Sequence, residues 1–127
     1  MIGRVVHHMK LCNIERFLDD EEDSTFRWNI FDKKNNKIGD FEFLKDEQDR
    51  IWLNGCGLSI QGKGIGSEVI KHAVNLFDAV YFCITPKDEL IGGGRGYDSR
   101  YLTEEGVVFM KSCLRKKIIK PEWVLSL

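Results

Sequence analysis

The sequence predicts a single domain of the α/β (α+β) class, with a mainly antiparallel sheet, a central parallel strand-helix-strand unit and flanking helices. Apolar and polar residues alternate through residues 26–30 and 41–43, which is typical of strands with one buried face. From residue 66 the apolar period changes to that of a helix, and a continuous apolar run follows at residues 79–85. A chain of 127 residues has the length of one domain, so we expect residues 1–127 to fold together.

The segment before this hairpin predicts one strand and one helix. Residues 2–6 have the composition of a short strand. Leu11, Ile14 and Leu18 recur at helical spacing and predict a helix that ends before five consecutive acidic residues at 19–23. We expect the acidic run to be a solvated loop, and the alternative is an acidic patch that attracts a cationic amine.

Turn residues separate the next predicted elements. Residues 33–37 close the hairpin, and residues 45–49 lead into a third antiparallel strand at 50–56. The following helix presents one apolar stripe: Val69, Ile70, Ala73, Val74 and Phe77. Because a helix connects residues 50–56 to residues 79–85, these two strands should be parallel neighbours.

The C-terminal part predicts a glycine-rich loop, a last helix and a tail strand. The loop spans residues 92–96, and Thr103 is the candidate N-cap of the helix. After Pro121 there is room for a short strand at residues 123–127. One face of the helix is apolar: Val107, Met110, Leu114 and Ile118.

Composition and charge disfavour several classes of protein. The net charge of -1 argues against a nucleic-acid partner held by electrostatics. No run of 18 apolar residues could cross a membrane, and the N-terminus is too short and polar for a signal peptide, so we expect a cytoplasmic protein. Four cysteines in apolar segments, without a C-x-x-C pair, predict reduced, buried thiols and no metal site: Cys12, Cys56, Cys83 and Cys113.

A glycine-rich turn at residues 58–67 lies between the third strand and the helix. Glycine can adopt positive φ and lets backbone N–H groups approach a ligand, and the amides at a helix N-terminus suit a phosphate. The dinucleotide fingerprint G-x-G-x-x-G fits in neither register. The P-loop pattern fits from Gly57 to Lys63, but Gly64 stands where a hydroxyl should bind magnesium. A P-loop-like nucleotide binder is therefore a minor alternative.

The pattern Gln61-x-x-Gly64-x-Gly66 resembles the Arg/Gln-x-x-Gly-x-Gly/Ala motif of the GNAT superfamily, and residues 26–85 are similar to the core of that fold. The resemblance implies that acetyl-CoA is the cosubstrate and that its acetyl group passes directly to a primary amine of a small molecule or peptide. In that family the two central strands separate at the loop and admit the pantetheine arm. Carried over by position, the implied cofactor-binding residues are Cys56, Gly57 and Leu58 for the pantetheine, and Gln61, Gly62, Lys63, Gly64, Ile65 and Gly66 for the pyrophosphate.

Such a reaction also needs a base for the acceptor ammonium and an acid for the departing thiolate. Glu42 is the candidate base, with Asp40 beside it on the solvent face of the hairpin. The last helix of the family often carries a tyrosine as the acid. Cys113 stands at that position, so Tyr101 is the candidate acid, with Tyr97 as the second. Each also fits a structural role, as an exposed strand carboxylate or a partly buried loop tyrosine.

A second hypothesis is a non-catalytic module of the same fold that binds coenzyme A or a protein. The missing helix tyrosine, the absence of a carboxylate in residues 50–56 and the short ends favour it. The sequence leaves a homodimer open.

The two glycines of the motif should respond differently to substitution. Gly64→Val is expected to abolish acetyl-CoA binding, whereas Gly66→Ala should retain most of that binding because the family accepts alanine there.

Overall fold

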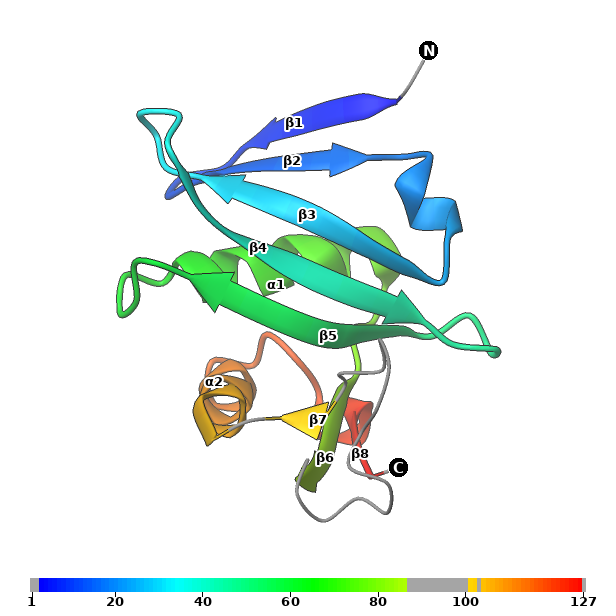
Figure 1. The fold of residues 1–127 in the computed structure, drawn as a ribbon. Helices are drawn as coiled ribbons and strands as arrows, with labels where there is room; N and C mark the ends of the chain where they lie inside the picture. The colour runs from blue at the N-terminus through cyan, green and yellow to red at the C-terminus, as the bar shows by residue number, and fades with distance from the viewer. Residues whose placement is uncertain (1–2, 87–100, 103, 127) are drawn as a thin grey trace.

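The computed structural model describes residues 3–86, 101–102 and 104–126. They form a mixed α+β fold with a five-stranded antiparallel sheet, a smaller three-stranded sheet and two α-helices (Figure 1). The strands of the larger sheet follow one another in chain order. They are β1 (Arg4–His8), β2 (Asn13–Phe17), β3 (Thr25–Phe31), β4 (Lys37–Lys45) and β5 (Ile51–Leu58).

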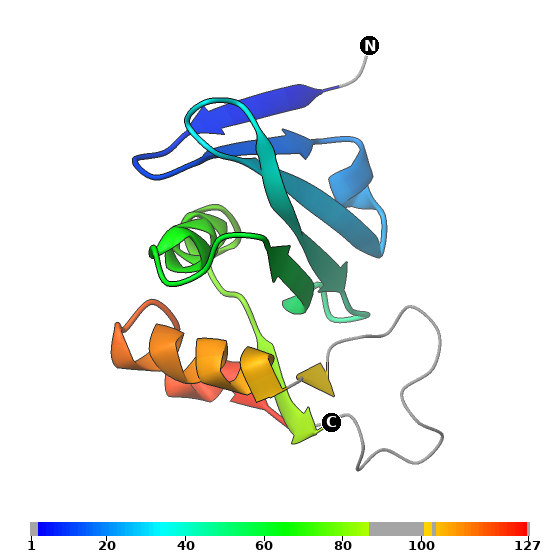
Figure 2. The ribbon, with the colours of Figure 1, turned by 60° about the vertical axis from the view of Figure 1, so that its left-hand side comes forward.

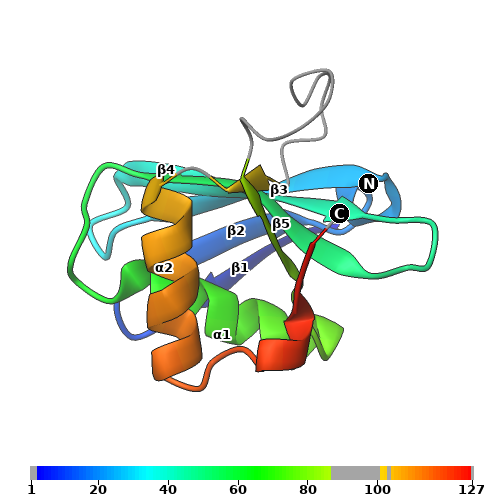
Figure 3. The ribbon, with the colours of Figure 1, turned by 90° about the horizontal axis from the view of Figure 1, so that it is seen from below.

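The second half of the chain supplies the helices and the smaller sheet. Both helices lie on the same side of the five-stranded sheet (Figure 3), and the smaller sheet lies beside α2 (Figure 2). In the smaller sheet β6 is central and parallel to both neighbours. These elements are α1 (Ile65–Phe77), β6 (Phe82–Pro86), β7 (Tyr101–Leu102), α2 (Glu104–Arg115) and β8 (Val124–Leu125), with a short 3₁₀ turn at Pro121–Trp123.

The core forms between the inner face of the larger sheet and α1. Alternate residues of β3 and β4 are buried, as the sequence pattern predicts. Phe77 of α1 packs its ring against Trp28 and Phe43, with centroids 5.7 and 6.2 Å apart. The α1 stripe is buried or partly buried along its length, which confirms the predicted helix: Val69, Ile70, Ala73, Val74 and Phe77.

The predicted helix at residues 11–18 is wrong, because this segment contains strand β2. The residues that point inward alternate, and one of them is Arg16, which is only 9% exposed. Its guanidinium lies 5.5 Å from the centre of the Trp28 ring and bonds to the Glu21 carboxylate. Leu11 and Leu18, the ends of the supposed helical stripe, are 40% and 42% exposed. Because the charged Arg16 occupies one of the inward positions, the alternation of apolar and polar residues that is typical of a strand is interrupted here.

Four of the five residues of the acidic run are exposed, as expected for a solvated loop, and the exception is Glu21. The run contains a 3₁₀ turn at Asp20–Glu22. Glu21 accepts hydrogen bonds from the Arg16 guanidinium and from Trp28 Nε1, the latter at 2.9 Å. This carboxylate is therefore a structural partner of the β2–β3 core.

β5 and β6 are parallel neighbours over a single bridge. Leu53 N–H donates to Tyr81 O (2.9 Å), and Tyr81 N–H donates to Ile51 O (2.8 Å). Beyond this point β6 pairs with β7 and β8, so the two strands part. The parallel arrangement expected from the sequence is confirmed at the start of these strands only.

The tail strand is confirmed as the short β8, whereas the predicted loop at residues 92–96 and the cap Thr103 lie outside the described residues. No helix in the described part of the chain is long and apolar enough to cross a membrane.

Candidate functional site

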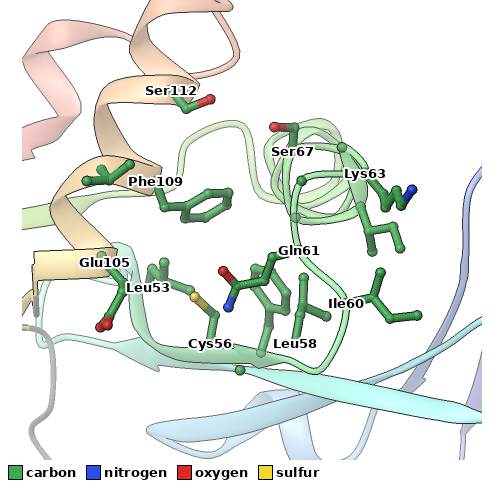
Figure 4. A pocket seen from close by; sticks show the side chains of 18 of the residues that line it. Leu53, Cys56, Leu58, Ile60, Gln61, Lys63, Ser67, Glu105, Phe109 and Ser112 are labelled. Atoms are coloured by element: carbon green, nitrogen blue, oxygen red, sulfur yellow. The ribbon is translucent and has the colours of Figure 1, made fainter.

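A cavity of about 930 Å³ lies between β5, the loop before α1 and α2 (Figure 4). β5 lines one side, the loop before α1 lines the second, and α2 lines the third. All nine residues that the sequence suggests for coenzyme binding border this one cavity: Cys56, Gly57, Leu58, Gln61, Gly62, Lys63, Gly64, Ile65 and Gly66. The structure thus brings them together, and their role as cofactor ligands stays a prediction.

A register shift in β5 lies next to the point where the strands part. Phe43 of β4 pairs with Leu53, whereas the neighbouring Glu42 pairs with Gly55, so Asn54 is an extra residue in β5. A bulge of this kind bends its strand and increases the local twist. The bulge directly follows the bridge to the β6 segment, so the bend lies at the point beyond which β5 no longer pairs with β6.

The backbone of β5 beyond the bulge offers donors to the cavity. Ser59 N–H donates to Ile38 O on the β4 side (2.7 Å). Successive N–H groups of a strand point in opposite directions. Those of Cys56 and Leu58 therefore point to the side that β6 has left, where a ligand carbonyl can accept a hydrogen bond from them.

The loop before α1 uses glycine where the backbone requires it. Gly62 (φ 75°) and Gly64 (φ 82°) are left-handed, a conformation that costs residues with a Cβ more than glycine. Gly64 is also the N-cap of α1, so the unpaired N–H groups of the first helical turn begin there. This end of the cavity therefore has the amides and the positive dipole end that suit an anionic group.

The turn between β1 and β2 supports the loop from outside the cavity. Glu68, in the first turn of α1, accepts hydrogen bonds from Leu11 N–H (2.9 Å) and the Cys12 thiol (3.4 Å). Burial, together with the hydrogen bond to Glu68, raises the pKa of Cys12 to about 12. Leu11 Cδ1 lies 3.5 Å from the position that a Cβ on Gly64 would take. These contacts join residues 53 to 57 positions apart, so no local pattern reveals them.

α2 contributes cavity residues that the sequence analysis missed. Phe109 projects from α2 toward the first turn of α1 (Figure 4). Lys116, directly after α2, donates from Nζ to Ser67 Oγ of α1 (3.0 Å). Glu104 and Glu105 line the cavity at the other end of the helix. The sequence gives the amphipathic pattern of α2 but not the helix against which it packs.

The side chains predicted to bind the cofactor differ in their directions. Gln61 points into the cavity, whereas Lys63 points away from α2 (Figure 4). Cys56 is exposed in the cavity, so the expectation that all four cysteines are buried is wrong for this residue, which lies on the strand segment that β6 leaves uncovered. The cavity walls desolvate its thiol and, with the Asp40 carboxylate, raise its pKa to about 11.

The predicted base, Glu42, does not line this cavity, and the position of the predicted acid, Tyr101, stays untested. Glu42 lies opposite Gly55, on the other face of the sheet from its neighbour Phe43, and borders a separate cavity of about 220 Å³. The strand β7 contains Tyr101, but its side chain lies outside the described residues, as does the whole of Tyr97.

Cys113, at the position where the family often has tyrosine, is fully buried in α2, and burial raises the pKa of its thiol to about 12. Among the described residues that line the cavity, the carboxylates are those of Glu104 and Glu105.

No family model, curated protein or solved structure matches this chain.

Proposed function

We propose that this protein is an N-acetyltransferase of GNAT-like architecture that transfers the acetyl group of acetyl-CoA to a primary amine. The observation that carries the proposal is one cavity in which β5, beyond its bridge to the β6 segment, meets a glycine loop at a helix N-terminus. The loop supports a pyrophosphate, and the open edge of β5 supports an amide-containing arm that runs away from it. These are the two requirements of a coenzyme A site.

The charges along the cavity favour one orientation of the ligand. Lys116 lies at the loop end, and Glu105 lies at the start of α2. Eleven residues separate them, which is about 16 Å along a helix axis at 1.5 Å per residue. An elongated ligand would therefore keep its phosphates beside the loop and its thioester near Glu105, where a cationic amine is also attracted.

The reaction needs positioning, a proton acceptor for the ammonium and a route that returns a proton to the leaving thiolate. The amine, once deprotonated, attacks the thioester carbonyl carbon and the C–N bond forms. As the C–S bond breaks, the proton that the nitrogen loses on becoming an amide passes through water to the thiolate. In this proposal the N–H group of Cys56 or that of Leu58 donates to the thioester carbonyl oxygen and stabilises the negative charge that develops on it. Glu105 is the side chain that we assign to proton removal, in place of Glu42.

One observation favours the non-catalytic alternative, a coenzyme A-binding or protein-binding module. The ring of Phe109 extends from α2 to Gly66 and occupies space between the two helices. A ligand that only binds could tolerate this ring beside its arm, whereas transfer also needs room for the acceptor.

Calorimetry with acetyl-CoA tests the proposal first, and release of free thiol with a panel of primary amines tests it second. Failure to bind acetyl-CoA at millimolar concentration rejects the coenzyme site. Tight binding without thiol release above solvent hydrolysis supports the non-catalytic module. Magnesium-ATP serves as the control for the P-loop-like alternative, and we expect it not to bind.

A further inference from the structure

Lys116 connects the two helices that border the cavity. Its Nζ donates a hydrogen bond to Ser67 Oγ at 3.0 Å, and both residues line the cavity. Ser67 belongs to the first turn of α1, directly after the glycine loop. The hydrogen bond therefore crosses the cavity at the end where the loop amides lie.

The way α2 ends holds the backbone of Lys116 in place. Lys117 is left-handed (φ 59°) and its N–H donates to Leu114 O (3.0 Å), while Ile118 N–H donates to Cys113 O (2.9 Å). This pair of hydrogen bonds is a Schellman motif, in which Lys116 is the last residue before the turn. Since its side chain is exposed, the ammonium can change its acceptor without any movement of the helix.

The charge at this end of the cavity favours an anionic guest. Lys63 and Lys116 are the cations among the described lining residues, and Lys63 points away from α2 (Figure 4). An ammonium has three donors, and it bonds a phosphate oxygen more strongly than a neutral hydroxyl. Ser67 is thus the weaker of the two acceptors that Lys116 would meet in the presence of a phosphate.

We propose that Lys116 is the residue that binds the phosphate end of an acyl-CoA in this cavity, exchanging the Ser67 hydroxyl for a phosphate oxygen when the ligand enters. The inference rests on the proposed function and adds the residue that selects a phosphorylated cofactor over its bare pantetheine arm. Bound ligand then links the end of α2 to the start of α1, and a ligand without phosphates gains nothing from Lys116.

The test compares acetyl-CoA with S-acetylpantetheine, which carries the same thioester arm without phosphates. Calorimetry on the full chain should show that Lys116→Met weakens acetyl-CoA binding about tenfold and changes S-acetylpantetheine binding by less than about twofold. The affinity of the variant for acetyl-CoA should also depend less steeply on salt. Lys111→Met removes the same charge from an exposed position of α2 outside the cavity and should bind as the unmodified chain does.

Each outcome decides the proposal. Equal weakening by Lys111→Met, or equal losses for the two ligands, would attribute the effect to net charge or to folding and overturn it. Undiminished acetyl-CoA binding by Lys116→Met overturns this inference alone, whereas no binding by the unmodified chain overturns the proposed function as well. If S-acetylpantetheine binds neither protein, the phosphates supply the measurable affinity and the loss in Lys116→Met still decides. Because Lys116 is exposed, the variant should keep its thermal transition, and Lys116→Gln provides a second test.

Discussion

Phe109 fills the space that any side chain at position 66 would need. A Cβ on Gly66 would lie 2.9 Å from Cε1 and 3.2 Å from Cζ of the Phe109 ring. The backbone of Gly66 is not left-handed, so its own conformation would admit alanine. The second glycine of the motif is therefore required here by helix packing, and the sequence-based expectation that alanine is mild omits this contact.

We predict that Gly66→Ala destabilises the protein by roughly 1 kcal/mol, because a methyl group forced into a packed site costs more than the helix gains from losing glycine. In the background of Phe109→Ala the same change should become neutral or stabilising by up to about 1 kcal/mol. Urea unfolding of the two single variants and the double variant measures the difference. An identical cost in both backgrounds would show that the ring is not the obstacle.

Gly64 should respond in another way, because its constraint lies in its own backbone. At φ 82° a β-branched residue is strained, so Gly64→Val should cost at least about 1 kcal/mol and displace the loop amides. We expect a cooperative thermal transition with loss of acetyl-CoA binding. Lys111→Met, at an exposed position of α2 outside the cavity, is the control. If Gly64→Val bound acetyl-CoA as the unmodified chain does, the loop would not be part of the binding site.

Cys56 offers a chemical probe of the cavity. It is the exposed cysteine, while Cys12, Cys83 and Cys113 are buried, so a maleimide should label the native protein at Cys56. A pKa of about 11 leaves little thiolate at neutral pH, and labelling should accelerate as the pH rises toward that value. Acetyl-CoA should slow the reaction. Peptide mapping by mass spectrometry identifies the labelled residue. If saturating acetyl-CoA leaves the rate of labelling at Cys56 unchanged, the ligand binds elsewhere.

A pair of histidines should make stability depend on pH. The rings of His7 and His72 have centroids 4.3 Å apart, and His72 Nε2 is buried with no hydrogen-bond partner among the described residues. Burial lowers the pKa of both rings from 6.5, and the nearby Arg16 guanidinium lowers it further. The His7 ring also lowers the pKa of His72, while Glu21 raises the pKa of His7 and Glu68 raises that of His72.

The unfolded chain therefore binds more protons below about pH 6.5, and the free energy of unfolding should fall as the pH decreases through the folded pKa values. Urea unfolding between about pH 7.5 and pH 5.5 should show this decline in the unmodified chain and a flatter profile after His7→Phe with His72→Phe. His8→Phe, at an exposed ring, should leave the decline in place. A profile that the double variant does not flatten would assign the decline to other groups.

The sequence was informative where the apolar pattern was unbroken. The hairpin of β3 and β4, the third strand and α1 follow from alternation and from the helical stripe, because one face of each is buried against the same core. β2 was misread because Arg16 occupies an inward position and is neutralised by Glu21, a contact that no periodicity contains.

Some parts of the candidate site could also be predicted from the sequence, and others could not. The loop could be predicted, since left-handed glycines and a helix start are local features, as at Gly64. The wall formed by α2 could not, because the contacts from Phe109 to Gly66 and from Lys116 to Ser67 join residues more than forty positions apart in the chain. The face of the sheet on which Glu42 lies depends on the pairing with β5, which also required the structure.

The extra residue in β5 has a consequence for how such a cavity arises. Asn54 contributes to the opening through its presence in the strand, since one residue more in β5 than in β4 bends the strand away from β6. A regular β5 could continue its pairing with β6 and leave less room between them. Loss of a single codon at this position could therefore close the cavity while every other residue that borders it is retained, and gain of one codon in a regular strand could create it.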